Sequence, residues 1–248
     1  MMGLHRALLF AAAFLFTGCG KDRAGCLTPL GDPVEKHVTL ETDIVQLQIE
    51  DEIDIVWDPN GQEQSAVVVA GEGLVDGIEL MTQEGVLSIV DRNTCKWVRD
   101  LSAIPEVRLS GIRPDTVDLW GQGRFSMTDS LHGGDLVIRG DEMAGPVELL
   151  FAGDTLRVRM PNGIGHVRVA GTARRFRSFR SGFGDLDARM LQSDQIMVHH
   201  AGVGEVRLAG PDYLYLEVAG HGNVHLLGEE GDWNIHVFPG ATGQVFWP

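Results

Sequence analysis

The sequence predicts an all-β fold, a single-domain parallel β-helix (solenoid) with rungs of about 20 residues. Three observations support this prediction. A small-x-Gly step recurs through the second half of the chain, a strand with alternating apolar residues follows each step, and a second apolar strand completes each repeat. The 248 residues are enough for one such domain.

Glycines that close each step set the repeat. They are spaced 18 to 22 residues apart, with an average of 20. A rung of this length is too short for a strand plus a crossover helix, and we expect glycine at the corners because it permits the positive φ that a sharp bend between short strands needs. The closing residues are Gly123, Gly145, Gly165, Gly184, Gly204, Gly222 and Gly243.

The second and fourth residues after each closing glycine are apolar in every repeat, whereas the residues between them are mostly polar. This alternation indicates a strand with one buried face. The first column is Phe125, Val147, Val167, Leu186, Val206, Val224 and Val245, and the second is Met127, Leu149, Val169, Ala188, Leu208, Leu226 and Trp247. The second strands contribute pairs such as Phe176/Phe179 and Trp233/Ile235. We expect one continuous core, closed at its C-terminal end by Trp233 and Trp247.

Residues 35–110 also alternate, but less regularly. Apolar runs cover Val38–Trp57, Ser65–Ala70, Ile78–Met81, Val86–Val90 and Val107–Leu109. We expect these to form the first coils of the same solenoid, with a cap at its N-terminal end. The β-helical domain is therefore predicted to cover residues 35–248.

The N-terminus predicts secretion. Residues 1–18 contain an Arg, the apolar run Ala7–Phe16 and then Thr17-Gly18, directly before Cys19. This order resembles a bacterial lipobox, which implies acylation of Cys19 and anchoring of the mature chain to a membrane. An ordinary signal peptide is the alternative. Residues 19–34 are predicted to be a tether, and the protein is expected in the cell envelope as an outer-membrane lipoprotein.

Acylation of Cys19 would leave Cys26 and Cys95 as an even pair in an oxidising compartment. We predict a disulfide between them that fixes the tether to the first coils. Two free buried thiols are the alternative.

A family resemblance is carried by Asp91-Arg92-Asn93-Thr94-Cys95-Lys96-Trp97-Val98-Arg99, together with the preceding segment Gly73–Ile78 and the later Gly-x-Gly rungs. The chain resembles the lipoproteins called putative auto-transporter adhesins with a head GIN domain (DUF2807), over roughly residues 26–248. The resemblance implies a β-helical fold at the surface of Bacteroidetes-type bacteria, and it supplies no catalytic residues.

Composition argues against several functions. A formal net charge of −15 disfavours nucleic-acid binding, which needs a basic surface. Asp185, Asp187 and Glu205 are the carboxylates to weigh for glycoside hydrolysis, but Arg168 and Arg207 flank Asp187 in its column, which is typical of a solvated charged face. We predict no enzymatic activity, no metal site and no cofactor.

One candidate site remains, in the residue that follows the last inward residue of each second strand. This column is aligned as Arg139, Arg159, Arg180, His199, Glu217 and His236, and the preceding outward column adds Arg157 and Tyr215. Like charges stacked about 5 Å apart repel one another, so the column is a candidate anion-binding site. Planar guanidinium groups suit carboxylate or sulfate groups. A solvated stripe balanced by nearby acids is the alternative.

Three functions stay open on this basis. The chain is a surface-tethered binding or adhesion module for an acidic glycan or an extracellular protein, a structural or accessory envelope lipoprotein without its own ligand, or a polysaccharide-active enzyme. We favour the first. The sequence does not fix the oligomeric state, and a homo-oligomer is compatible with it.

Overall fold

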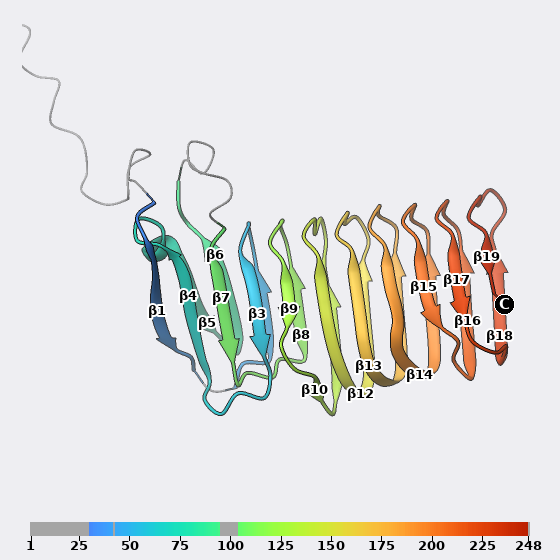
Figure 1. Cartoon of the computed structure of the whole chain (residues 1–248), viewed down its shortest axis with the longest axis horizontal. Helices are drawn as coiled ribbons and strands as arrows, with labels where there is room; N and C mark the ends of the chain where they lie inside the picture. The colour runs from blue at the N-terminus through green and yellow to red at the C-terminus, as the bar shows by residue number, and fades with distance from the viewer. Residues whose placement is uncertain (1–29, 42, 95–103, 248) are drawn as a thin grey trace, which may run out of the picture.

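The computed structural model describes residues 30–41, 43–94 and 104–247. They form a parallel β-solenoid of about seven turns with rungs of about 20 residues (Figure 1), and the fold prediction is confirmed. The signal segment 1–18, most of the tether, and Cys19, Cys26 and Cys95 lie outside the described residues. No helix in the described ranges is long and apolar enough to cross a membrane.

The regular part of the solenoid begins at residue 116, and its strands pair in parallel from rung to rung. The first apolar column is in register throughout, as Val147, Val167, Leu186, Val206 and Val224 show. The strands are β8 (Thr116–Leu119), β9 (Phe125–Met127), β10 (Leu131–His132), β11 (Asp135–Arg139), β12 (Val147–Met160), β13 (Val167–Arg180), β14 (Leu186–His200), β15 (Val206–Ala209), β16 (Tyr213–Val218), β17 (Val224–Leu227), β18 (Asp232–Val237) and β19 (Val245–Phe246).

The closing glycines are required by close stacking of successive corners. A Cβ added at Gly204 would lie 2.0 Å from the carbonyl oxygen of Gly184, and one added at Gly123 would lie 1.9 Å from that of Ile53. Neither glycine has a positive φ. The expectation that these corners need the left-handed conformation is therefore wrong: they need the absence of a side chain.

The first coils do not follow chain order. The coil built from β2 (Gln46–Ile49) and β3 (Asp54–Asp58) lies between the later coil of β6 (Val86–Asp91) and β7 (Glu106–Ser110) on one side and β8 and β9 on the other. The strands predicted in this half are present, but residues 46–58 are inserted between two segments that come after them.

Antiparallel strands cover the N-terminal end of the solenoid. β1 (Pro33–Thr39) pairs with β4 (Ser65–Gly71), and β4 pairs with β7. β5 (Ile78–Gln83) pairs with β6, and a short 3-10 helix (Val75–Gly77) precedes it. These elements provide the cap that a solenoid needs at this end.

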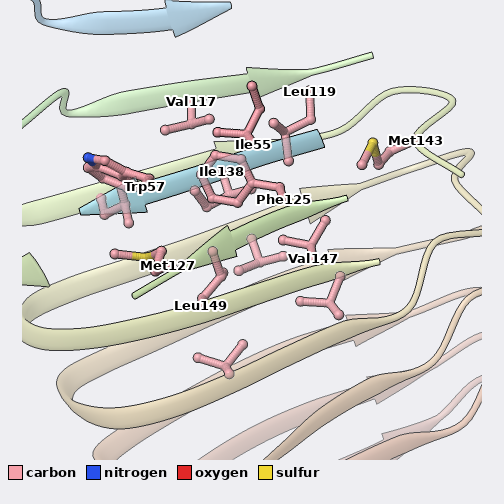
Figure 2. Packing of buried hydrophobic residues seen from close by; sticks show 14 of the residues in the cluster. Ile55, Trp57, Val117, Leu119, Phe125, Met127, Ile138, Met143, Val147 and Leu149 are labelled. Carbon is pink, nitrogen blue, oxygen red and sulfur yellow. The ribbon is translucent and has the colours of Figure 1, made fainter. Parts of the chain in front are cut away.

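The core is one continuous column of aliphatic and aromatic side chains. Near the start of the regular part, Trp57 and Phe125 pack with ring centroids 6.0 Å apart among Val117, Leu119 and Ile55 (Figure 2). Trp57 Nε1 also donates a hydrogen bond of 3.1 Å to the carbonyl of Ile112, so its polar atom is satisfied inside the core.

The C-terminal end of the core is less closed than predicted. Trp233 packs against the core but is only partly buried, and Trp247 is 49% exposed. The expected role of Trp247 is therefore wrong, because Trp247 lies just beyond the end of β19 at Phe246 and no rung among the described residues covers its side chain.

Candidate functional site

One face of the solenoid carries the predicted arginines. It is formed by β11, β16, β18 and the second halves of β12, β13 and β14, which pair in register. Two outward columns run along this face. The first column is Arg139, Arg159, Phe179, His199, Glu217 and His236, and the second is Val137, Arg157, Arg177, Met197, Tyr215 and Asn234.

Arg180 does not belong to either column, so its assignment to the site is wrong. It is in register with Met160 and His200, points into the core and is 2% exposed. The inward residues of this strand are Phe176 and Ser178 followed by Arg180, and Phe179 takes the outward position. Aligning Phe176 with Phe179 as an inward pair shifted the rung by one residue, and such a shift moves a side chain to the opposite face.

The structure brings five of the six predicted residues onto the same face and adds two that the alignment missed. We call this set the arginine face: Arg139, Arg157, Arg159, Arg177, Phe179, His199 and Tyr215. Side chains along a strand alternate between its two faces. With Phe176 pointing inward, Arg177 and Phe179 both point outward, so strict alternation would have identified both residues.

Contacts between neighbouring rungs hold the side chains of the first column. Arg139 forms a two-point ion pair with the buried carboxylate of Asp118, with Nε–Oδ1 and Nη2–Oδ2 distances of 2.5 and 2.9 Å. The guanidinium of Arg159 lies over the ring of Phe179, 5.7 Å from its centroid. That ring stacks on His199 at 5.1 Å, with an interplanar angle of 7°.

The next rungs continue these contacts with hydrogen bonds. His199 Nδ1 donates to Glu217 Oε2 at 2.8 Å, and the Tyr215 hydroxyl donates to Glu217 Oε1 at 2.9 Å. The bond from His199, followed by that from Tyr215, lowers the pKa of the Glu217 carboxyl. The same carboxylate raises the pKa of Tyr215, so the phenol stays protonated as a donor. These contacts fix the two rings at the edge of the arginines.

Three guanidinium groups on this face are not neutralised. No ion pair joins Arg157, Arg159 or Arg177 to a carboxylate of the described residues. Arg157 and Arg177 occupy adjacent positions in register, about 4.8 Å apart from strand to strand. In a chain with a net charge of −15 this local excess of positive charge needs an anion or solvent to offset it.

The opposite face is balanced. Its outward column alternates in sign from Glu148 to Arg168, Asp187 and Arg207. Arg168 lies 4.0 Å from Glu148, and Arg207 lies 3.6 Å from Asp185. Charge on this face is satisfied within the chain, so it offers less to a charged ligand.

The carboxylates considered for catalysis are all held by arginine. Arg189 binds Asp187 through two nitrogens and lowers the pKa of that carboxyl. Arg207 contacts both Asp185 and Glu205. Glycoside hydrolysis needs one carboxyl group that stays protonated near neutral pH, and arginine contacts favour the ionised form. Within the described ranges no group of three metal-ligating side chains comes together.

Comparison with known proteins identifies a family and a shared fold. The model of the family "Putative auto-transporter adhesin, head GIN domain" (DUF2807) matches residues 45–229. A crystal structure described as a "putative adhesin" from Bacteroides fragilis NCTC 9343 has a TM-score of 0.76 and 14% identity, and the match covers 89% of this chain and 99% of that one.

Two further crystal structures agree. A "putative adhesin" from Parabacteroides merdae ATCC 43184 has a TM-score of 0.60 and 17% identity, with 89% of this chain and 98% of that chain covered. A "putative lipid binding protein" from Parabacteroides distasonis ATCC 8503 has a TM-score of 0.63 and 15% identity, covering 87% and 97%. At these identities the likeness shows the fold alone. No curated protein matches the chain.

Proposed function

The chain belongs to the DUF2807 family ("Putative auto-transporter adhesin, head GIN domain"), and we propose that it is a non-catalytic binding module of the cell envelope whose arginine face binds an acidic glycan. One observation carries this proposal: Arg157, Arg159 and Arg177 project from one face without carboxylate partners, beside the fixed rings of Phe179 and His199.

The chemistry of the face fits repeated acidic groups. Guanidinium groups bind carboxylates and sulfates through paired hydrogen bonds. Phe179 adds apolar surface next to Arg159, and Tyr215 adds a second aromatic ring two strands beyond Arg177 on the same face. Because the arginines repeat from rung to rung, a linear polyanion lying along the solenoid axis meets a charge at each strand spacing of about 4.8 Å.

The test is binding of heparin and polygalacturonate at low salt, with hydrolysis of each polymer followed in parallel. The variant is Arg157→Ser/Arg159→Ser/Arg177→Ser, and we expect it to bind at least about tenfold more weakly, which corresponds to about 1.4 kcal/mol over three contacts. Binding by the wild type is expected to weaken with added salt, since the contacts are exposed.

A matched control removes the same charge elsewhere. Arg92→Ser/Arg124→Ser/Arg168→Ser changes three exposed arginines away from this face and breaks only surface ion pairs, which contribute little to stability. Equal loss in both variants would mean that binding follows net charge and not the site. No binding by the wild type would leave a structural or accessory envelope lipoprotein, and release of sugar would indicate an enzyme.

We also propose that Cys19 is the lipid anchor and that Cys26 bonds to Cys95. The basis is the order of the N-terminal segment and the even pair of remaining cysteines. Cys19→Ser is expected to move the protein out of the membrane fraction. Mass spectrometry of the unreduced chain is expected to show Cys26 and Cys95 protected from alkylation, and two alkylatable thiols would contradict the disulfide.

A further inference from the structure

The two ends of the solenoid differ in whether antiparallel strands cover the last rung. Antiparallel strands cover the N-terminal end, whereas β18 and β19 end the row of strands at the other (Figure 1). β18 pairs with β16, β19 pairs with β17, and no other described strand pairs with either of them. An open edge of this kind is a template for pairing with another chain.

The backbone polarity of β18 is fixed by its bonds to the previous rung. The amide of Asp232 donates to Asp212, and the amide of Phe238 donates to Val218, both at 2.8 Å. Backbone groups alternate in direction along a strand, so the N–H and C=O groups of Trp233, Ile235 and Val237 point away from β16. These groups have no partner among the residues that the structure describes.

Four large apolar side chains are exposed at this end. Val237, Phe238, Phe246 and Trp247 are 47, 37, 45 and 49% exposed, respectively. Terminal repeats of solenoids normally present a polar outer face. The N-terminal edge strand β1 follows that rule with Glu35, Lys36 and His37, of which Glu35 pairs with Arg108. The C-terminal end differs, because it exposes large apolar side chains beside the polar outward residues Asp232, Asn234 and His236 of β18.

We propose that the open edge of β18 pairs with the same strand of a second copy, antiparallel about a two-fold axis at Asn234. The backbone groups that point away from β16 must face the same groups of the second copy, and side chains that point toward the core must lie opposite each other. Only registers that pair odd-numbered residues with odd-numbered residues are therefore allowed. Centring on Asn234 places Trp233 opposite Ile235 of the second copy, in a hydrogen-bonded pair.

This register also places a carboxylate opposite an imidazole that can donate a hydrogen bond to it. Asp232 then lies opposite His236 of the second copy, and the pair occurs twice because the interface is isologous. Centring on Ile235 instead would place Asp232 opposite Phe238, and centring on Trp233 would place it opposite Asn234. The two-fold arrangement at Asn234 therefore matches the direction of the backbone hydrogen bonds, the apolar faces and the polar outward residues together.

A disulfide tests the register in the full chain. Asn234 faces its own copy in a non-hydrogen-bonded pair with a Cα–Cα distance of about 4.5 Å, which a disulfide spans at about 4.4 to 6.8 Å. Asn234→Cys is expected to form a covalent dimer under mild oxidation. Gln192→Cys, at an exposed position in the middle of the solenoid, keeps the same native cysteines and is the control. Equal cross-linking of both variants, or of neither, would overturn the proposal.

A charge swap tests the pairing without a covalent bond. His236→Asp places two carboxylates opposite each other at both ends of the interface, and dimerisation measured by sedimentation is expected to weaken about tenfold. Asp232→Lys/His236→Asp restores opposite charges across the two-fold axis and is expected to restore the dimer. A wild type that sediments as one 27.0 kDa chain at every concentration, a double variant no better than His236→Asp, or head-to-tail polymers would each contradict the inference.

Discussion

Arg180 provides the sharpest test of the register in the core. Its side chain is 2% exposed, Nη2 donates to the carbonyl of Gly165 at 3.1 Å, and Nη1 has no hydrogen-bond partner. Burial lowers the pKa of this guanidinium from its ordinary value to about 10, against a smaller opposing effect of the Asp185 charge. At 1.36 kcal/mol per pKa unit, this corresponds to about 3 kcal/mol against the charged form in the folded state.

The sign of the effect follows from linkage. The pKa is lower in the folded chain than in the unfolded chain, so the unfolded chain holds the proton more tightly. The penalty is fully present below about pH 10 and is relieved only as the pH rises from there toward the ordinary pKa of arginine. At neutral pH the charge on Arg180 therefore lowers the free energy of unfolding by the whole amount.

Arg180→Met should stabilise the fold. Methionine occupies the same column one rung earlier, at Met160, so its shape suits this position. The change removes a penalty of about 3 kcal/mol and one hydrogen bond of about 1 kcal/mol, which leaves a gain of about 2 kcal/mol. For a chain of this size we expect Tm to rise by about 4 to 8 °C, measured by circular dichroism.

Two further variants make this test decisive. Arg177→Met changes the exposed residue of the same strand and is expected to alter stability by less than about 0.5 kcal/mol. Arg180→Ala removes the charge but leaves a cavity, so it should be less stable than Arg180→Met. If Arg180→Met lowers Tm as much as Arg180→Ala does, the argument from burial is refuted.

Two other predictions follow from the same geometry. Gly123→Ala should destabilise the fold by roughly 3 kcal/mol or more, because its Cβ would meet the Ile53 carbonyl oxygen at 1.9 Å, whereas Gly133→Asn, where a Cβ meets nothing within 4 Å, should cost far less in chemical denaturation. The Glu217 pKa, followed by carbon NMR, should rise toward its ordinary value more in His199→Ala than in Tyr215→Phe, since His199 lowers it most. A larger rise in Tyr215→Phe would contradict this order of causes.

The regular half of the fold could be predicted from local pattern alone. A rung of about 20 residues and apolar residues at alternate positions determine which side chains enter the core, and Val206 and Leu208 are fully buried as expected. Pattern does not determine which strand lies next to which. Gln46 pairs with Thr116, which lies 70 positions further along the chain, and alternation in either segment carries no information about that choice.

The candidate site was predictable except where the local pattern was ambiguous. In Phe176-Arg177-Ser178-Phe179-Arg180, two phenylalanines three residues apart cannot both point inward on a strand of period two. Hydrophobicity favours Phe179 in the core, yet the rungs on either side place Arg159 and His199 outward at the same level. The neighbouring rungs determine the result, and Arg180 becomes buried as a consequence.

β18 belongs to the same sheet as the arginine face, so pairing at the edge of β18 determines how the arginine faces of two copies are arranged. Pairing β18 with its copy extends this sheet, and because Asp232 and His236 point outward on both sides of the axis, the outward columns of the two copies share one surface. Arg177 lies three rungs from β18. At about 4.8 Å per strand, the two Arg177 residues are then about 34 Å apart.

A polymer long enough to span that distance engages both copies, and the second contact is intramolecular, which raises overall affinity without any new contact. A short oligosaccharide gains nothing from the second copy. If both proposals hold, exposed charges that each bind weakly and a two-fold axis together favour long, repetitive, acidic ligands.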